Sequence, residues 1–165
     1  MHRASSLFLL VVSCIHFSFC SAEDKQRVPQ RGSGGISGRV SSQFVSGIAG
    51  ATVYLFTVEQ SSRIQNLREK AREVMRVRAE DSVTVTNAVA GFYDQMADLV
   101  PRLPRVAKMK TNSKGTYNFQ RVSAGKKYQV VFMDIGEDGV HFGAVTTPTV
   151  KPGQDLQIHL SDGVW

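Results

Sequence analysis

The feature that most constrains the fold is a series of short segments, each followed by a turn, in which successive side chains point to opposite faces. In residues 51–58, Val53 and Leu55 face one way and Tyr54 and Phe56 the other. Alternation with period two in β-branched and aromatic residues is typical of strands. The chain has seven such segments: residues 36–41, 51–58, 106–111, 116–121, 127–133, 140–149 and 155–161. This spacing predicts an all-β fold, a seven-stranded β-sandwich.

Residues 62–104 depart from this pattern and predict a helical insertion between the second and third strands. Apolar residues of the first part recur every three or four positions: Ile64, Leu67, Ala71 and Val74. Ser62 and Gln65 have the spacing of a capping box for a helix over residues 62–80. A second amphipathic helix is expected over residues 87–99, whereas the β-branched residues 81–86 leave helix and strand both open. Two successive helices predict a helical hairpin.

Residues 1–22 have the three parts of a secretory signal peptide. Arg3 supplies a positive charge, residues 7–19 form an apolar run, and Cys20-Ser21-Ala22 offers small residues for cleavage. The run is shorter than the roughly 20 residues that span a bilayer, so no transmembrane segment is expected in the mature chain. The alternative is lipid attachment at Cys14. We predict a secreted or periplasmic protein with a flexible lead-in, residues 23–35, before a sandwich domain, residues 36–161.

Charge and cysteine content limit the partners and the chemistry. Both cysteines lie in the predicted leader, so the mature chain has neither a disulfide nor a thiol nucleophile. Removing the leader lowers the formal charge from +6 to +5. The interleaving of aromatic and basic residues that single-strand nucleic-acid binders use is missing. We therefore expect a protein or polysaccharide of the cell envelope as partner, and no nucleic acid.

Four segments resemble the carboxypeptidase-regulatory-like domains, which share a transthyretin-like (prealbumin-like) sandwich with Cna-B-type modules. They are Ile36-Ser-Gly38-Arg-Val40, Gly50-Ala51-Thr-Val53-Tyr-Leu55, Lys110-Thr111 through Gly115-Thr-Tyr117-Asn-Phe119, and Val122-Ser-Ala-Gly125 with Tyr128-Gln-Val130. The resemblance implies a Greek-key sandwich. Its third and fourth strands are expected to form a hairpin with Gly115 at positive φ, and the fifth strand to lie beside them. The long helical insertion departs from the family, in which this connection is short.

Three chemistries are associated with this fold, and each requires particular residues. The transthyretin-related hydrolase of hydroxyisourate needs a Tyr-Arg-Gly-Ser ending, whereas this chain ends in Ser161-Asp-Gly-Val-Trp165. The isopeptide bond of Cna-B modules needs a lysine in the first strand, which instead has Arg39, a side chain that stays protonated. The candidate metal ligands do not have the sequence spacing of a zinc or calcium site. They are His141, His159, Asp134, Glu137 and Asp138. We expect no enzyme, with no catalytic residue, cofactor or metal.

Two surfaces are candidates for binding. The first comprises Tyr54, Phe56 and Trp165, whose rings would stack on a sugar if exposed; packing of the insertion over the first two is the other interpretation.

The second surface is the basic helix, in which Arg68, Arg72 and Arg76 either dock an acidic partner or form a solvated face. The expected function is a non-catalytic binding or structural accessory module that mediates protein interaction. The alternative is a carbohydrate-binding module of starch-binding-like fold.

Overall fold

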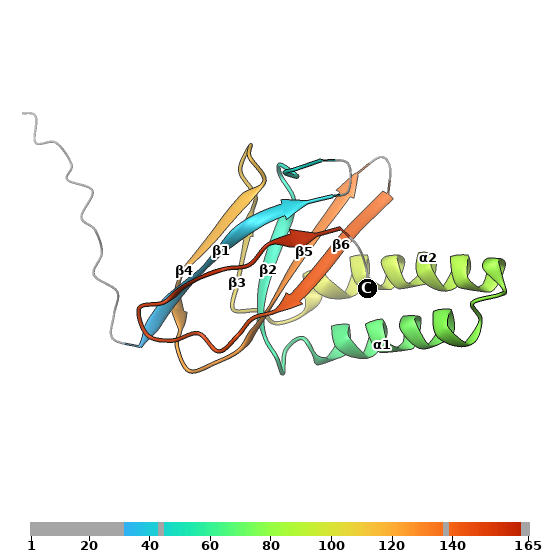
Figure 1. The fold of residues 1–165 in the computed structure, drawn as a ribbon, viewed down its shortest axis with the longest axis horizontal. Coiled ribbons are helices and arrows are strands. Elements are labelled where there is room, and N and C mark those ends of the chain that lie inside the picture. The colour runs from blue at the N-terminus through green and yellow to red at the C-terminus, as the bar shows by residue number, and fades with distance from the viewer. Residues whose placement is uncertain (1–31, 43–44, 137–138, 163–165) are drawn as a thin grey trace, which may run out of the picture.

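The computed structural model describes residues 32–42, 45–136 and 139–162 (Figure 1). These residues form two four-stranded sheets and two helices. The predicted leader, residues 23–31 of the lead-in, and Trp165 lie outside the described residues. Within the described ranges, no helix is both long and apolar enough to cross a membrane.

The first sheet brings together the two ends of the described chain. Its strands are, in order, β4 (Thr116–Ser123), β1 (Ser33–Ser41) and β7 (Asp155–Gln157), while β8 (Leu160–Ser161) pairs with β1 beyond β7. β1 is antiparallel to β4 and parallel to β7 and β8. The Gly35 N–H donates to the Gln154 carbonyl at 2.9 Å. β1 begins at Ser33, three residues before the predicted start, because Ser33 and Gly34 pair with Ser123 and Val122 of β4.

The second sheet contains β3 (Ala107–Lys110), β2 (Thr52–Thr57), β5 (Tyr128–Gly136) and β6 (Gly139–Thr146), all antiparallel. The predicted hairpin of the third and fourth strands is therefore wrong, because β3 pairs with β2 and β4 pairs with β1 in the other sheet. The turn at Gly115, with φ of 72° as predicted, carries the chain across the sandwich. Crossing lets Met109 and Tyr117 pack into one core from opposite sheets. The fifth strand likewise pairs with β2 instead of β4.

The described chain forms eight strands instead of the seven predicted, because the last predicted strand is interrupted at residues 158–159. Ile158 approaches β1 so closely that a Cβ on Gly38 would lie 1.8 Å from the Ile158 carbonyl oxygen. That oxygen accepts a hydrogen bond of 2.5 Å from the Tyr117 hydroxyl. A side-chain hydroxyl at this carbonyl and the close approach at Gly38 accompany the break between β7 and β8.

The insertion between β2 and β3 consists of α1 (Ser62–Val77), α2 (Ser82–Leu99) and a short 3₁₀ turn, η1 (Val100–Arg102). The predicted capping box at Ser62 is wrong, because the N-cap is Ser61, whose hydroxyl donates to the Val58 carbonyl at 2.9 Å. α2 begins five residues before its predicted start. Asp81 caps it by accepting a hydrogen bond from the Thr84 N–H at 3.1 Å, and this cap offsets the weak helix propensity of residues 83–86.

Two hydrophobic cores lie on opposite faces of the second sheet. Val53, Leu55 and Phe132 fill the core between the sheets. The alternate residues of the same strands, such as Phe56, face the other way and pack with Phe92 and other helical side chains. One side of the sheet is thus covered by the first sheet and the other by the hairpin, whose turn projects beyond the sandwich (Figure 1).

Truncating Phe142 tests the second core. Phe142 on β6 is fully buried, and its ring meets the ring of Phe92 edge-on at 5.6 Å. We expect Phe142→Ala to lower the free energy of unfolding by about 3–5 kcal/mol, because it leaves a cavity between helix and sheet. Ile135→Ala is the matched control, since Ile135 is 65% exposed, and it should change stability by less than about 0.5 kcal/mol. Chemical denaturation measures both, and equal losses would contradict the assigned packing.

We expect replacement of two glycines by alanine to change the stability of the protein in opposite directions. A Cβ on Gly143 of β6 would lie 2.4 Å from the Ser161 carbonyl oxygen, so Gly143→Ala should destabilise the protein by about 1–3 kcal/mol. Gly91 is in α2 with its nearest neighbour, Gln95 Nε2, 4.0 Å away, so Gly91→Ala should stabilise it by about 0.5–1 kcal/mol. Thermal and denaturant unfolding of the two variants checks the signs. A tolerated Gly143→Ala would exclude the close approach of β6 to β8.

Candidate functional site

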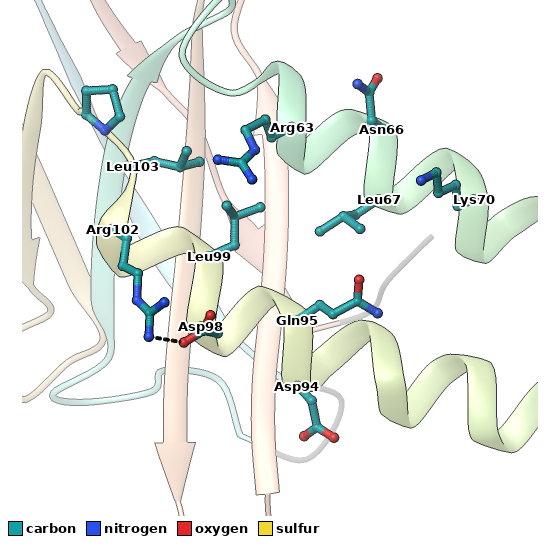
Figure 2. Close-up of a pocket in the computed structure, with 11 residues that line it drawn as sticks. Arg63, Asn66, Leu67, Lys70, Asp94, Gln95, Asp98, Leu99, Arg102 and Leu103 are labelled. Atoms are coloured by element: carbon teal, nitrogen blue, oxygen red, sulfur yellow. Dashed lines mark ion pairs between the residues drawn. The ribbon is translucent and has the colours of Figure 1, made fainter.

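A groove of about 750 Å³ lies between α1 and α2, which pass in front of the strands of the second sheet in the view of Figure 2. We call it the hairpin groove. Leu67, Leu99 and Leu103 form its apolar floor, and these leucines also pack against the core beneath the helices. The floor is therefore held by the same contacts that attach the hairpin to the sheet.

The two walls of the hairpin groove differ in charge. The α1 wall consists of Arg63, Asn66 and Lys70, which share a face because they are three and four residues apart. The α2 wall and its extension into η1 supply carboxylates, an amide and one cation: Asp94, Gln95, Asp98 and Arg102. A cationic wall thus faces a mainly anionic wall across an apolar floor.

Ion pairing leaves most of these charges available. Arg102 pairs with Asp98, four residues before it on the same wall (Figure 2). Among the described residues, no ion pair joins α1 to α2 across the groove, and Arg63, Lys70 and Asp94 form none. In the described portion of the chain, the hairpin groove therefore presents unpaired charges of both signs.

The three arginines proposed from the sequence lie outside the hairpin groove. Arg68 is half-buried with its Nε atom buried and without a hydrogen bond. Burial lowers the pKa of its guanidinium, repulsion by Arg72 lowers it further, and Glu69 opposes both. Arg72 is exposed, and Arg76 is paired with Glu73 at 2.8 Å on the surface. Within the basic helix, the structure places Arg63 and Lys70, and not these three, beside a cavity.

The sequence contains a signal for the hairpin groove that becomes visible only when α1 and α2 are considered together. Arg63 and Lys70 are seven residues apart, and Asp94 and Asp98 are four apart, so each pair lies on one helix face. Treating the two helices as an antiparallel pair would have placed these faces opposite each other. The residues of α1 alone do not reveal the acidic wall, because that wall belongs to α2.

Tyr54 and Phe56 are in the core beneath the helices. Tyr54 is 7% exposed and Phe56 is fully buried, with ring centroids 6.0 Å apart. The guanidinium of Arg105 lies 5.7 Å from the centre of the Tyr54 ring. Neither ring presents a face on which a sugar can stack, so the predicted aromatic platform does not form from these two residues. Trp165 lies outside the described residues.

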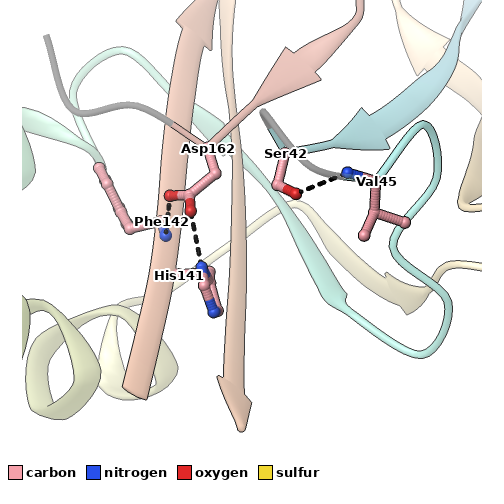
Figure 3. Close-up of polar contacts among 5 residues, drawn as sticks. All are labelled: Ser42, Val45, His141, Phe142 and Asp162. Carbon is pink, nitrogen blue, oxygen red and sulfur yellow. Dashed lines mark hydrogen bonds and ion pairs between the residues drawn. The ribbon is translucent and has the colours of Figure 1, made fainter. Parts of the chain in front are cut away.

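His141 on β6 lies at hydrogen-bond distance from Asp162, which directly follows β8, with Nδ1 and Oδ2 2.6 Å apart (Figure 3). The other carboxylate oxygen of Asp162 accepts a hydrogen bond of 3.4 Å from the Phe142 N–H. Burial raises the pKa of Tyr93 on α2, and the negative charge of Asp162 raises it further. Asp162 thus joins the last described residues to the second sheet and acts electrostatically on the hairpin.

The residues considered for a metal are distributed over separate places. His141 and Asp134 are paired across β5 and β6 in the second sheet. His159 is exposed and follows β7 in the first sheet. Glu137 and Asp138 lie outside the described residues. Among the residues that are described, no group of three or more His, Cys, Asp or Glu side chains could hold a metal ion.

No protein-family model matches the chain, and no curated protein matches it. Solved structures of bacterial proteins resemble it distantly. The Bacillus anthracis TIE protein aligns over 78% of this chain and 17% of its own, with 11% identity and a TM-score of 0.35. The pilus backbone RrgB of Streptococcus pneumoniae aligns over 75% and 39%, with 10% identity and a TM-score of 0.30.

The shaft pilin SpaA of Lactobacillus rhamnosus GG aligns over 80% of this chain and 49% of its own, with 12% identity and a TM-score of 0.33. This chain thus spans less than half of each of these structures. The TM-scores lie below 0.5, so the similarities assign no family.

The pKa of Tyr93 tests whether the charge of Asp162 lies close to the hairpin. Removing the Asp162 charge in Asp162→Asn should lower the Tyr93 pKa, which burial keeps above its ordinary value. Because the pKa of Tyr93 is raised in the folded state, neutral Tyr93 contributes to the free energy of unfolding. This contribution is fully present below the unfolded-state pKa of about 10 and is lost as pH rises through the folded-state pKa. Ultraviolet titration, with Tyr93→Phe subtracted, measures the shift. Asp98→Asn is the control, and an equal effect there would contradict this proximity.

Proposed function

We propose that the chain is an exported, non-catalytic accessory module of the carboxypeptidase-regulatory-like, transthyretin-like type, which binds another protein at the cell envelope through its helical hairpin. One observation carries this proposal. The hairpin groove has an apolar floor between walls of different charge, and Arg63, Lys70 and Asp94 on these walls form no ion pair within the described chain. Such a groove suits a polypeptide segment that carries both charges beside apolar side chains.

The position of the hairpin supports the same function. It covers the second sheet with its sheet-facing side and projects beyond the sandwich at its turn (Figure 1). Val77 and Val83, near that turn, are 59% and 68% exposed. A partner can therefore contact the hairpin without disturbing the sandwich. The alternative, a carbohydrate-binding module with an aromatic platform, loses support because Tyr54 and Phe56 are buried.

Site-specific photo-crosslinking tests this function in cells that produce the protein. A benzoylphenylalanine at Asn66, in the wall of the hairpin groove, should crosslink to a discrete protein, whereas one at the exposed Lys151 should not. Reversing both groove cations, Arg63→Glu with Lys70→Glu, should reduce the crosslinked product by about tenfold, because repulsion replaces attraction.

The matched control is Arg72→Glu, which changes an exposed arginine of the same helix outside the groove and should leave the product unchanged. Circular dichroism verifies that all variants are folded. Equal products from the double reversal and from Arg72→Glu would exclude the groove as the docking site. The absence of any product from Asn66 would count against protein docking altogether.

A further inference from the structure

The outer face of the first sheet has a different character from the rest of the sandwich. The helices cover the outer face of the second sheet, whereas no helix of the described residues packs on this one (Figure 1). Its outward positions on β1, β4 and β7 are polar: Ser37, Arg39, Ser41, Thr116, Asn118, Gln120, Asp155 and Gln157, with His159 between β7 and β8. Hydroxyl, amide and charged groups thus form an array on an exposed surface.

A hollow of about 550 Å³ lies in the middle of this face, where β7 gives way to β8. Its outward side chains are Ser37, Arg39, Ser41, Thr116, Gln157 and His159. The surrounding side chains leave Arg39 and His159 exposed. The Tyr117 hydroxyl also borders the hollow but is committed to the Ile158 carbonyl, which fixes the segment that carries His159.

The strand register places Arg39 and His159 side by side. β1 pairs Ser37 with Gln157 and Val40 with Leu160, so Arg39 and His159 occupy equivalent positions between these two pairs. Neither side chain forms an ion pair within the described part of the chain. The residues that line the hollow include no carboxylate. An arginine and a histidine are therefore adjacent within the hollow, and the outward carboxylate of β7, Asp155, lies beside Gly35 and outside the lining.

We propose that this hollow binds an acidic saccharide, with a sugar carboxylate on Arg39 and His159 and sugar hydroxyls on the surrounding serine, threonine and glutamine side chains. An arginine presents parallel donors that match the two oxygens of a carboxylate. Hydroxyl and amide side chains both donate and accept, as sugar hydroxyls do. The site is separate from the hairpin groove, so this inference does not rest on the proposed function.

The surface favours a saccharide over an acidic peptide. Peptides recognised by sheets add a strand at an edge or insert side chains into apolar pockets. The hollow is in the interior of the sheet, over β1, which already has partners on both sides. No apolar side chain points outward from the positions that line it. Recognition by charge and hydrogen bonds alone also predicts that binding weakens as salt is added.

Nuclear magnetic resonance titration of the purified, ¹⁵N-labelled protein tests the proposal. Tetragalacturonate should shift amide signals of residues 37–41, 116–118 and 157–161, and the neutral cellotetraose should bind more weakly. Arg39→Gln should reduce the affinity for tetragalacturonate by about tenfold, the loss of one charge-assisted contact, and Arg39→Lys should restore part of it. His159→Gln should reduce the affinity by a smaller factor.

Two controls separate this site from others. Lys108→Gln removes an exposed cation from β3 in the second sheet, and Arg63→Glu with Lys70→Glu alters the hairpin groove, so neither should change the affinity. Wild-type affinity in Arg39→Gln, or signal shifts outside the named residues, would overturn the site. Equal binding of tetraglutamate or of free acetate would overturn the assignment to a saccharide.

Discussion

The pairing of β2 with β5 supports both hydrophobic cores of the protein. Their antiparallel register places Val53 opposite Phe132 on the inner face and Tyr54 opposite Val131 on the outer face. Six consecutive residues of β5, from Tyr128 to Met133, are buried, which requires cover on both faces. The first sheet covers one face and the helices the other. The hairpin is consequently part of the fold, because without it Phe56 and its neighbours would face water.

The sequence predicts the elements well, and their partners less well. Alternation identifies the strand segments and the position of the insertion, because burial on one face leaves a local pattern. It does not reveal that β3 and β4 belong to different sheets, since a hairpin and a crossing turn both use Gly115 at positive φ. It also does not reveal the break after Gln157, because that depends on Gly38 and Tyr117, which are distant in sequence.

The candidate sites also depend partly on local sequence patterns and partly on contacts with residues distant in sequence. A basic helix can be recognised from its own residues, but which of its cations border a cavity depends on the neighbouring helix. Arg68 was selected from the sequence and is half-buried, whereas Arg63 and Lys70 face the carboxylates of α2. Tyr54 and Phe56 show the limit of alternation in another way. An aromatic residue on the second face of a strand is exposed or buried according to what covers that face, and here a segment later in the chain covers it.

The parallel pairing of β1 with β7 and β8 has a consequence for the order of folding. Ile36 pairs with Leu156 and Val40 with Leu160, so β1 lies near the start of the described chain and these two partner strands lie near its end. Contacts between such distant residues carry a large loop-closure entropy and slow folding. The second sheet and the hairpin can assemble from residues 52–146, and β1 can pair with β4 within residues 33–123, but β7 and β8 add to β1 only once residues 155–161 are present. A chain that emerges from its N-terminus therefore cannot complete its first sheet until nearly all of the described residues have been released.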